Sequence, residues 1–260
     1  MAVQKGFKID VNQCISCRSC EMACKVEYNL RRGQGRRRRV IEKTVDEGDI
    51  RTFFISLACN HCANPACLMA CPKGAYSKAM NASNRALNLS SANPVPASQV
   101  INNDLSTYPE GVVLHDPAKC IGCRRCEWAC PYGAPQFDAV RARMHKCEMC
   151  WQRVKSTSLH SSRRVPACVA TCIGGAIKLM DIDPRIAASA DAVTEKDYFL
   201  RDDNLVANQF KPGTADGTGV GFSAAGDAGR GSSYLADRSL TNPAVRVRNR
   251  RYINRDGTVS

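Results

Sequence analysis

The sequence predicts an α+β fold made of two similar units, and three observations support this prediction. Sixteen of the 260 residues are cysteine, and they fall into four groups of four. The groups repeat in sequence, which indicates an internal duplication. Short apolar segments at 7–10, 111–115 and 176–181 predict strands on either side of the cysteine-rich loops.

The composition indicates that hydrophobic burial alone does not support this fold. Hydrophobic residues make up 44% of the sequence and aromatic residues only 6%. Without the cysteines the apolar share falls to about 38%, which is a lean core for one or two domains. A bound group that ties segments of the chain together would supply the missing stabilisation.

Two classes of segment are missing from the sequence. No stretch approaches the roughly 18 apolar residues of a membrane span, so we do not expect an integral membrane protein. Lys5, Lys8 and Asp10 interrupt the beginning of the chain, which has no apolar h-region. We therefore expect no secretory signal of its own.

The four cysteine groups have defined spacings. The first and third groups share the pattern C-x2-C-x2-C-x3-C, and they consist of Cys14, Cys17, Cys20 and Cys24, and of Cys120, Cys123, Cys126 and Cys130. The second group has the pattern C-x2-C-x4-C-x3-C and consists of Cys59, Cys62, Cys67 and Cys71. The fourth group is split by a 17-residue gap and consists of Cys147, Cys150, Cys168 and Cys172. No cysteine is left over.

The repeat extends beyond the cysteines themselves. Segments 14–24 and 120–130 are identical at eight of eleven positions. Segments 65–75 and 166–176 share the pattern Pro-Ala-Cys-x3-Cys-x2-Gly-Ala. A unit with groups one and two is thus followed by a unit with groups three and four, as an internal duplication requires.

The spacing of the first and third groups is typical of [4Fe–4S] clusters. Three closely spaced cysteines wrap one cluster in a tight loop, and the fourth points toward a neighbouring cluster. Cys20 and Cys24 are four residues apart on an expected helix, so about 6 Å of axial rise separates them. Sixteen cysteines therefore predict four [4Fe–4S] clusters that lie close enough for electron transfer.

Other interpretations fit less of the pattern. Structural zinc favours paired C-x2-C knuckles, which only the fourth group resembles, and disulfides are typical of small secreted chains. The net charge of +13 falls to about +5 if four clusters contribute roughly −2 each. Because no nucleic-acid-binding motif is present, we expect no nucleic-acid partner. We find no catalytic arrangement of residues, so we expect no direct small-molecule substrate.

Three segments resemble a known family. They are CNHCANPAC (59–67), CIGCRRCEWACPYGAPQF (120–137) and MHKCEMC (144–150). On these segments the sequence resembles the four-cluster iron–sulfur subunits of molybdenum or tungsten bis-pterin oxidoreductases, and it is most similar to the electron-transfer subunit of anaerobic dimethyl sulfoxide reductase. The resemblance extends from about residue 5 to about residue 182.

The resemblance implies two interleaved bacterial ferredoxin-like units, each with two [4Fe–4S] clusters, together with long loops and an extended C-terminal tail. Groups one and four would share two clusters, and groups two and three the other two. The implied ligands are Cys14, Cys17, Cys20 and Cys172 for the first cluster, and Cys24, Cys147, Cys150 and Cys168 for the second. They are Cys59, Cys62, Cys67 and Cys130 for the third cluster, and Cys71, Cys120, Cys123 and Cys126 for the fourth. Spacing alone does not choose this pairing.

Two positions distinguish this sequence from relatives of this family. Cys123 stands where nitrate-reductase-like relatives have a tryptophan and hold a three-iron centre, so we expect four complete clusters here. Ile173 follows Cys172 where close relatives have proline, which adds a backbone N–H near a cluster.

Four segments are expected along the chain. Residues 1–58 contain the first cysteine motif and an arginine-rich loop. Residues 59–143 form the second ferredoxin-like unit with an insertion at 79–110, and residues 144–183 complete the first unit. Residues 184–260 are expected to begin with a helix after Asp183 and to continue as a tail that docks on a partner.

Two polar segments have two possible interpretations each. Residues 79–110 contain six asparagines and three charges, and we expect a surface insertion that is either a solvated loop or a partner contact. Residues 31–39 contain six arginines, and we expect either a solvated strand or loop that balances cluster charge, or a contact with a partner or membrane surface. The glycine-rich segment 211–233 should lack regular structure by itself.

A few single residues stand near the predicted ligands. His61 and Trp128 lie between cysteines, so we expect them to pack around the clusters and influence their potentials. Arg18 and Arg124 recur at matched positions and either stabilise reduced clusters or are simply exposed. We expect the other three histidines to be ordinary surface or core residues and not ligands.

The sequence therefore predicts a non-catalytic electron-transfer subunit. By resemblance, its partners are a large molybdenum or tungsten bis-pterin catalytic subunit and an integral-membrane anchor that reacts with quinol or quinone. It would lie peripherally on the membrane, on the periplasmic face if a signal-bearing partner exports it, or otherwise on the cytoplasmic face. The alternatives are a stand-alone soluble polyferredoxin and the equivalent subunit of a polysulfide, tetrathionate, nitrite or formate enzyme.

Overall fold

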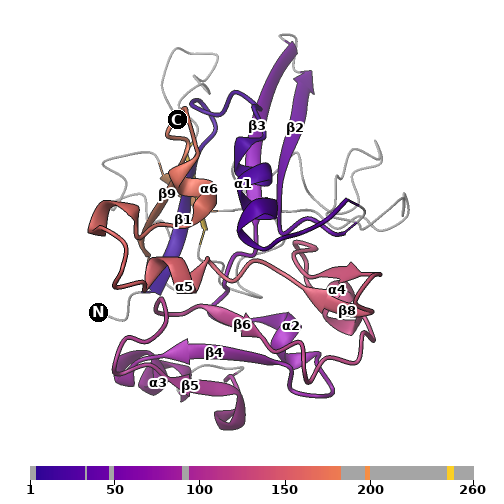
Figure 1. The fold of residues 1–260 in the computed structure, drawn as a ribbon, viewed down its shortest axis with the longest axis vertical. Helices are drawn as coiled ribbons and strands as arrows, with labels where there is room; N and C mark the ends of the chain where they lie inside the picture. Colours follow the sequence, from indigo (N-terminus) through magenta and orange to yellow (C-terminus); the bar gives the residue numbers. More distant parts are fainter. Residues whose placement is uncertain are drawn as a thin grey trace.

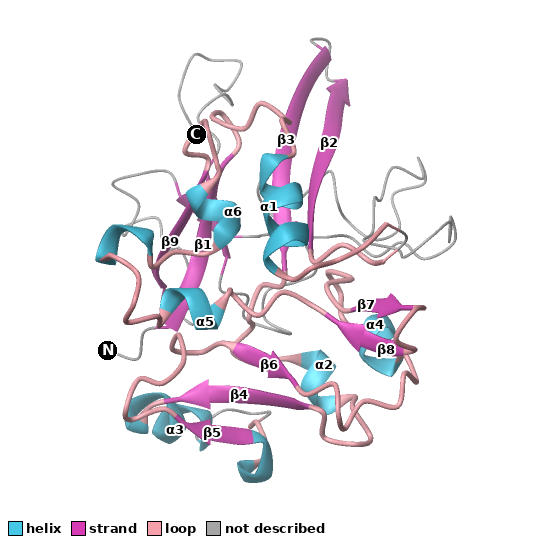
Figure 2. Cartoon of the chain, in the orientation of Figure 1, coloured by secondary structure: helices cyan, strands magenta, loops and turns pink. Residues whose placement is uncertain are grey.

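The computed structural model describes residues 4–32, 34–46, 50–89, 94–182, 197–199 and 245–248. Short helices and small sheets alternate along these residues, as expected for an α+β fold (Figure 2). Among them, no helix is long and apolar enough to cross a membrane.

The first sheet combines distant parts of the chain. Its strand order is β10 (Asp197–Phe199), β11 (Val245–Arg248), β1 (Gln4–Asp10) and β9 (Ile177–Ile182). β1 pairs antiparallel with β9 and parallel with β11. Phe7 and Ile9 of β1 are buried in the core. The strands predicted at 7–10 and 176–181 are thus confirmed.

Part of the C-terminal tail belongs to this protein's own fold. Val245–Arg248 pairs with Phe7–Asp10, so this stretch of the tail contacts its own chain, and the docking of residues 184–260 on a partner stays a prediction. This edge of β1 is covered by a backbone from the same chain, which satisfies its hydrogen-bonding groups. The helix predicted after Asp183 and the segment 211–233 lie outside the described residues.

The arginine-rich segment leads into a long hairpin. β2 (Arg38–Asp46) pairs antiparallel with β3 (Ile50–Ala58), in register from Arg38 with Ala58 to Asp46 with Ile50. Ile55 and Leu57 of β3 are buried in the same core as β1. Figure 1 shows the hairpin next to α1 (Ser19–Glu27), and Ser56 of β3 lies against Cys20 of the first cysteine group.

Short helices lie within or next to each cysteine group. These helices are α1, α2 (Ala66–Met69), α4 (Arg125–Ala129), α5 (Trp151–Val154) and α6 (Ala167–Ala170). α1 contains Cys20 and Cys24, which confirms the helix expected there. α1 packs against α6, and α2 packs against α4. The first cysteine group therefore lies beside the fourth, and the second beside the third.

The second part of the fold contains two further small sheets. β5 (Val100–Asn102), β4 (Tyr76–Met80) and β6 (Val113–His115) form one in that order, and β7 (Gln136–Asp138) pairs with β8 (Arg143–His145) in the other. β6 confirms the strand predicted at 111–115. In Figure 1 the β4 sheet lies at the opposite end of the molecule from the β2–β3 hairpin.

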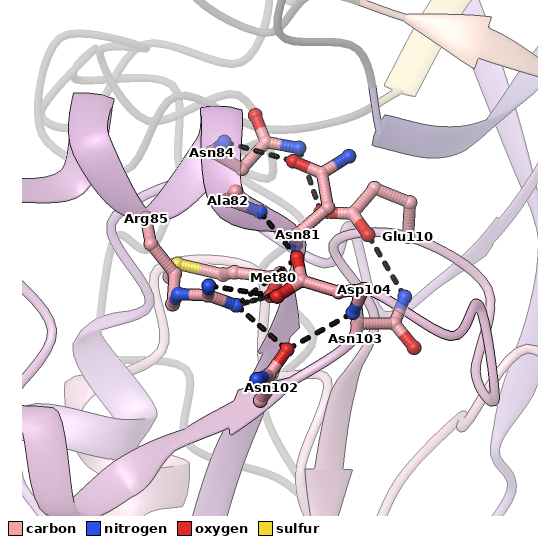
Figure 3. A network of polar contacts seen from close by, with 9 residues as sticks. All are labelled: Met80, Asn81, Ala82, Asn84, Arg85, Asn102, Asn103, Asp104 and Glu110. Carbon is pink, nitrogen blue, oxygen red and sulfur yellow. Dashed lines mark hydrogen bonds and ion pairs between the residues drawn. The ribbon is translucent and has the colours of Figure 1, made fainter.

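The described parts of the segment 79–110, which are residues 79–89 and 94–110, contain regular structure, so the interpretation as a loop is wrong for them. The segment contains α3 (Ala82–Leu89), the 3-10 turn η1 (Ala97–Gln99) and β5. Another 3-10 turn, η2 (Ser161–Arg163), lies outside this segment, between α5 and α6. Figure 3 shows how polar side chains hold the segment 79–110 together: Arg85 donates to the Met80 carbonyl at 3.0 Å and forms an ion pair with Asp104 at 2.9 Å. The asparagine-rich composition therefore reflects helix ends and turns that need side-chain acceptors.

Candidate iron–sulfur sites

The sixteen thiols lie in four sets of electrostatic neighbours. The first set contains Cys14, Cys17, Cys20 and Cys172, and the second contains Cys24, Cys147, Cys150 and Cys168. The third contains Cys59, Cys62, Cys67 and Cys130, and the fourth contains Cys71, Cys120, Cys123 and Cys126. The structure thus brings together the thiols that the family resemblance assigns to each cluster.

The four sets also follow one another in space. Cys168 of the second set interacts electrostatically with Cys20 of the first. Cys147 of the second set interacts with Cys59 of the third, and Cys130 of the third interacts with Cys126 of the fourth. The contacts run from set one to set four in order. α1 links the first two sets covalently through its two cysteines, and the α4 segment links the last two.

The two most exposed cysteines belong to the first and fourth sets. Cys17 and Cys123 are exposed, and the other fourteen are buried or half-buried. The two occupy equivalent positions in the repeated motif. Each end of the series of thiols therefore has one ligand candidate at the surface, whereas the second set is wholly buried and the third is buried or half-buried.

The buried thiols need a cation to ionise. Burial raises the pKa of Cys147 to about 12, and burial and the neighbouring cysteines both raise the pKa of Cys24. Thiolates are the form that binds metal, and metal binding displaces the thiol proton. Iron held by these cysteines would satisfy this requirement, because the iron charge would replace the proton charge.

The backbone around the cysteines is shaped to receive an anion. Left-handed residues recur in every cysteine group, at Ser16, Arg18, His61, Gly122, Arg124, Met149 and Cys150. Such residues are uncommon for side chains other than glycine. Alternating right- and left-handed residues turn successive N–H groups to one side and form nests that bind anions and iron–sulfur clusters. A cluster with four thiolates is such an anion.

Backbone N–H groups also point at cysteine sulfur atoms. Ala75 donates to Cys71 Sγ at 3.3 Å, and Ala134 donates to Cys130 Sγ at 3.4 Å. Both donors follow a glycine in the left-handed conformation, Gly74 or Gly133. Hydrogen bonds of this kind stabilise thiolate charge and influence cluster potential.

Three buried cations lie beside the thiols, and the sequence pattern does not single them out. Arg38, Lys78 and Lys146 are 2%, 3% and 1% exposed. Lys78 donates to the carbonyls of Cys62 at 2.8 Å and Gly111 at 2.7 Å, and Lys146 donates to those of Val113 and Cys147. Carbonyls are neutral partners, whereas a buried cation requires an anionic one. Bound iron–sulfur clusters would supply the missing negative charge.

This burial corrects the interpretation of residues 31–39. Arg37 is 13% exposed at its side chain and forms an ion pair with Glu148 at 3.3 Å, and Arg38 is fully enclosed. A solvated segment is therefore wrong for these two residues. No periodicity in an arginine run distinguishes the buried arginine from its neighbours, so only the three-dimensional structure identifies it.

The single residues near the ligands have different environments. His61 is fully buried, and its Nδ1 accepts the Val113 N–H at 3.1 Å, in agreement with the expected packing. Trp128 is 64% exposed, so the expectation that it packs around a cluster is wrong. Arg124 forms an ion pair with the buried Glu127 at 2.8 Å, which neutralises much of its charge.

Comparison with known proteins finds an iron–sulfur domain and iron–sulfur subunits. Residues 95–182 match the model of the 4Fe-4S dicluster domain. The sequence is 34% identical to the B subunit of anaerobic dimethyl sulfoxide reductase from Haemophilus influenzae, over 69% of this protein and 75% of the relative. It is 32% identical to the B subunit from Escherichia coli, over 71% and 75%. This protein belongs to the same family of iron–sulfur subunits.

The same family extends to other enzymes. The sequence is 32% identical to the formate dehydrogenase iron-sulfur subunit of Wolinella succinogenes, over 68% of this protein and 81% of the relative. The residues present fit an iron–sulfur cofactor in three independent respects: grouped thiols, left-handed backbone nests and buried cations without carboxylate partners at hydrogen-bonding distance in the described part.

Proposed function

We propose that the protein relays electrons through four [4Fe–4S] clusters between a membrane quinol- or quinone-reacting anchor and a molybdenum or tungsten bis-pterin catalytic subunit. When bound, the clusters supply one-electron carriers at close spacing. The protein's own residues hold, space and insulate these carriers. It performs no substrate chemistry itself.

The proposed ligands are the four thiol sets described above. Their support is electrostatic proximity within each set and the packing of α1 on α6 and of α2 on α4. This packing pairs group one with group four and group two with group three, as two interleaved ferredoxin-like units require. We therefore assign four ligands to each of four clusters.

The observation that carries the proposal is the linear order of the sets, with an exposed cysteine at each end. Buried intermediate sets keep water away from the carriers, and exposed ends allow electrons to enter and leave. A storage protein or an isolated cluster would not need two open ends.

Both ends also expose apolar side chains. Ile15, Met22 and Ile173 are 65%, 59% and 78% exposed and adjoin the first set in sequence, and Ile121 and Trp128 are 59% and 64% exposed and adjoin the fourth. Exposed apolar clusters mark interaction sites. We infer that one end meets the catalytic subunit and the other meets the anchor. The subunit would then be peripheral to the membrane within the complex.

The test is purification of the native protein under anaerobic conditions with its associated subunits. We expect about sixteen irons per polypeptide, molybdenum or tungsten in a large partner, and electron paramagnetic resonance signals of several reduced clusters. A lone iron-rich polypeptide would instead favour a free polyferredoxin. Zinc without iron would refute the proposal.

Two matched variants test the assignment of the ends. Cys17→Ser and Cys123→Ser each change one exposed cysteine at equivalent positions of the repeat. We expect each to alter one cluster signal, a different one in each variant, while the other three persist. Loss of the same signal in both variants would contradict the four-set assignment.

A further inference from the structure

Arg38 occupies an unusual position at the beginning of β2. Its side chain is buried, with Nη1 donating to the Ser56 carbonyl at 3.0 Å and to Ser56 Oγ at 3.1 Å. The guanidinium carbon lies 4.6 Å from the centre of the Phe7 ring. These contacts fix a positive charge inside the protein between β1, β2 and β3.

The guanidinium faces thiols of two neighbouring sets. Ser56 Oγ, which accepts from Arg38, is 3.2 Å from Cys20 Sγ of the first set. Arg38 also interacts electrostatically with Cys24, Cys147 and Cys168 of the second set. Its Nη2 is buried and has no hydrogen-bond partner in the described part of the protein.

No carboxylate neutralises this charge at close range among the described residues: Arg38 forms no ion pair there. Its neighbours Arg36 and Arg37 pair instead with Glu21 and Glu148. A lone buried guanidinium is strongly unfavourable unless an anion accompanies it. The nearest candidates for that anion are the groups held by the first two thiol sets.

We propose that Arg38 is the shared internal counter-charge of the first and second clusters, which raises their reduction potentials relative to a neutral residue at this position. The inference rests on the function proposed above. Arg38 binds no iron itself, but its charge would influence the reduction potentials of the first and second clusters.

The reason is electrostatic. Reduction adds one electron to a cluster and therefore one negative charge to its site. A fixed positive charge nearby stabilises the reduced form more than the oxidised form, and burial prevents salt and water from screening it. Removing the charge must lower the potential. The fourth set lies two sets further along, so its potential should change least.

The test uses the full-length protein in its native complex. Arg38→Met removes the charge and keeps an unbranched side chain, Arg38→Lys keeps the charge, and Arg32→Met removes an exposed arginine as the matched control. Redox titration followed by electron paramagnetic resonance measures each cluster, and iron analysis shows whether all clusters are present.

We expect Arg38→Met to lower the midpoint potential of at least one cluster by about 59 mV. For a one-electron couple this shift corresponds to a tenfold change in the reduction equilibrium. Arg38→Lys should restore part of the shift, and Arg32→Met should cause none. Unchanged potentials in an Arg38→Met protein with full iron content would overturn the inference.

A second measurement decides the matter if Arg38→Met fails to assemble. Wild-type protein with arginine labelled by nitrogen-15 in the guanidinium should give hyperfine coupling between that nitrogen and a reduced cluster. Absence of any such coupling would overturn the inference, although the proposed function would stand. A wild-type protein without iron–sulfur signals would overturn the proposed function and this inference together.

Discussion

Substitution of Gly122 by alanine should open the loop of the third cysteine group. Gly122 has φ +70°, and a Cβ at this position would lie 2.4 Å from the carbonyl oxygen of Ala142. The left-handed conformation costs a non-glycine residue about 1–2 kcal/mol, and overpacking against the 139–142 turn costs about 1–3 kcal/mol. We therefore expect Gly122→Ala to destabilise the loop by about 2–5 kcal/mol.

The internal repeat provides the control. Ser16 is the residue equivalent to Gly122 in the first group and is already left-handed, with φ 58°. Ser16→Ala keeps this strain in both proteins, so its effect should stay within about 0.5 kcal/mol. Ser16→Gly removes the strain but also increases the conformational entropy of the unfolded state. The net result should be a stabilisation of the loop by about 0.5–1 kcal/mol.

The assay follows loss of the visible iron–sulfur absorbance during anaerobic incubation with an iron chelator in moderate denaturant. Because cluster loss is irreversible, rates are compared. Gly122→Ala should bleach at least tenfold faster than wild type, since a factor of ten requires only about 1.4 kcal/mol. Equal rates for Gly122→Ala and Ser16→Ala would refute the steric reasoning.

Three further outcomes are expected. Trp128→Ala should leave the iron content unchanged and weaken the binding of one partner subunit, measured by affinity chromatography with this protein immobilised. Met22→Ala, at the matched position of the repeat, should weaken the binding of the other partner subunit. Loss of iron in either variant would contradict the docking role. Removal of all iron by anaerobic chelation should abolish cooperative thermal unfolding, measured by calorimetry, because buried cations lose their counter-charges; a sharp transition in the iron-free protein would argue against this. Burial, aided by the charges of Lys146 and Arg37, lowers the pKa of His115 to about 4 in the folded state. As the pH falls, the His115 imidazole is therefore protonated in the unfolded state before it is protonated in the folded state. Stability should then drop by roughly 2–3 kcal/mol between about pH 6.5 and pH 4, and His115→Gln should remove that part of the slope in denaturant titrations at each pH.

Much of the local structure could be predicted because it depends on residues close in sequence. The strands at β1, β6 and β9 and the helix at α1 follow from short apolar segments and from the four-residue separation of Cys20 and Cys24. The cysteine spacing likewise predicts cluster loops, because three ligands of one cluster come from seven residues.

The remaining features depend on contacts between distant segments. Arg38 is buried because β1 and β3 surround it, and nothing within its own run of arginines indicates this. Val245–Arg248 forms a strand because the edge of β1 is available to it. Residues 79–110 fold because Arg85 and Asp104 meet across the segment. The position of Trp128 between cysteines predicts an enclosed side chain, yet α4 turns it outward.

The topology also determines when the subunit can mature. β1 lies near the beginning of the sequence, but its two neighbouring strands are β9 and β11, and α1 packs on α6. Residues 177–182 and 245–248 must therefore be synthesised before the first sheet is complete, and such distant pairing makes folding slow. Until then, thiols emerging early are unprotected from oxygen and stray metal. A cofactor held jointly by the first and fourth cysteine groups would therefore be completed only after Cys172 has been synthesised.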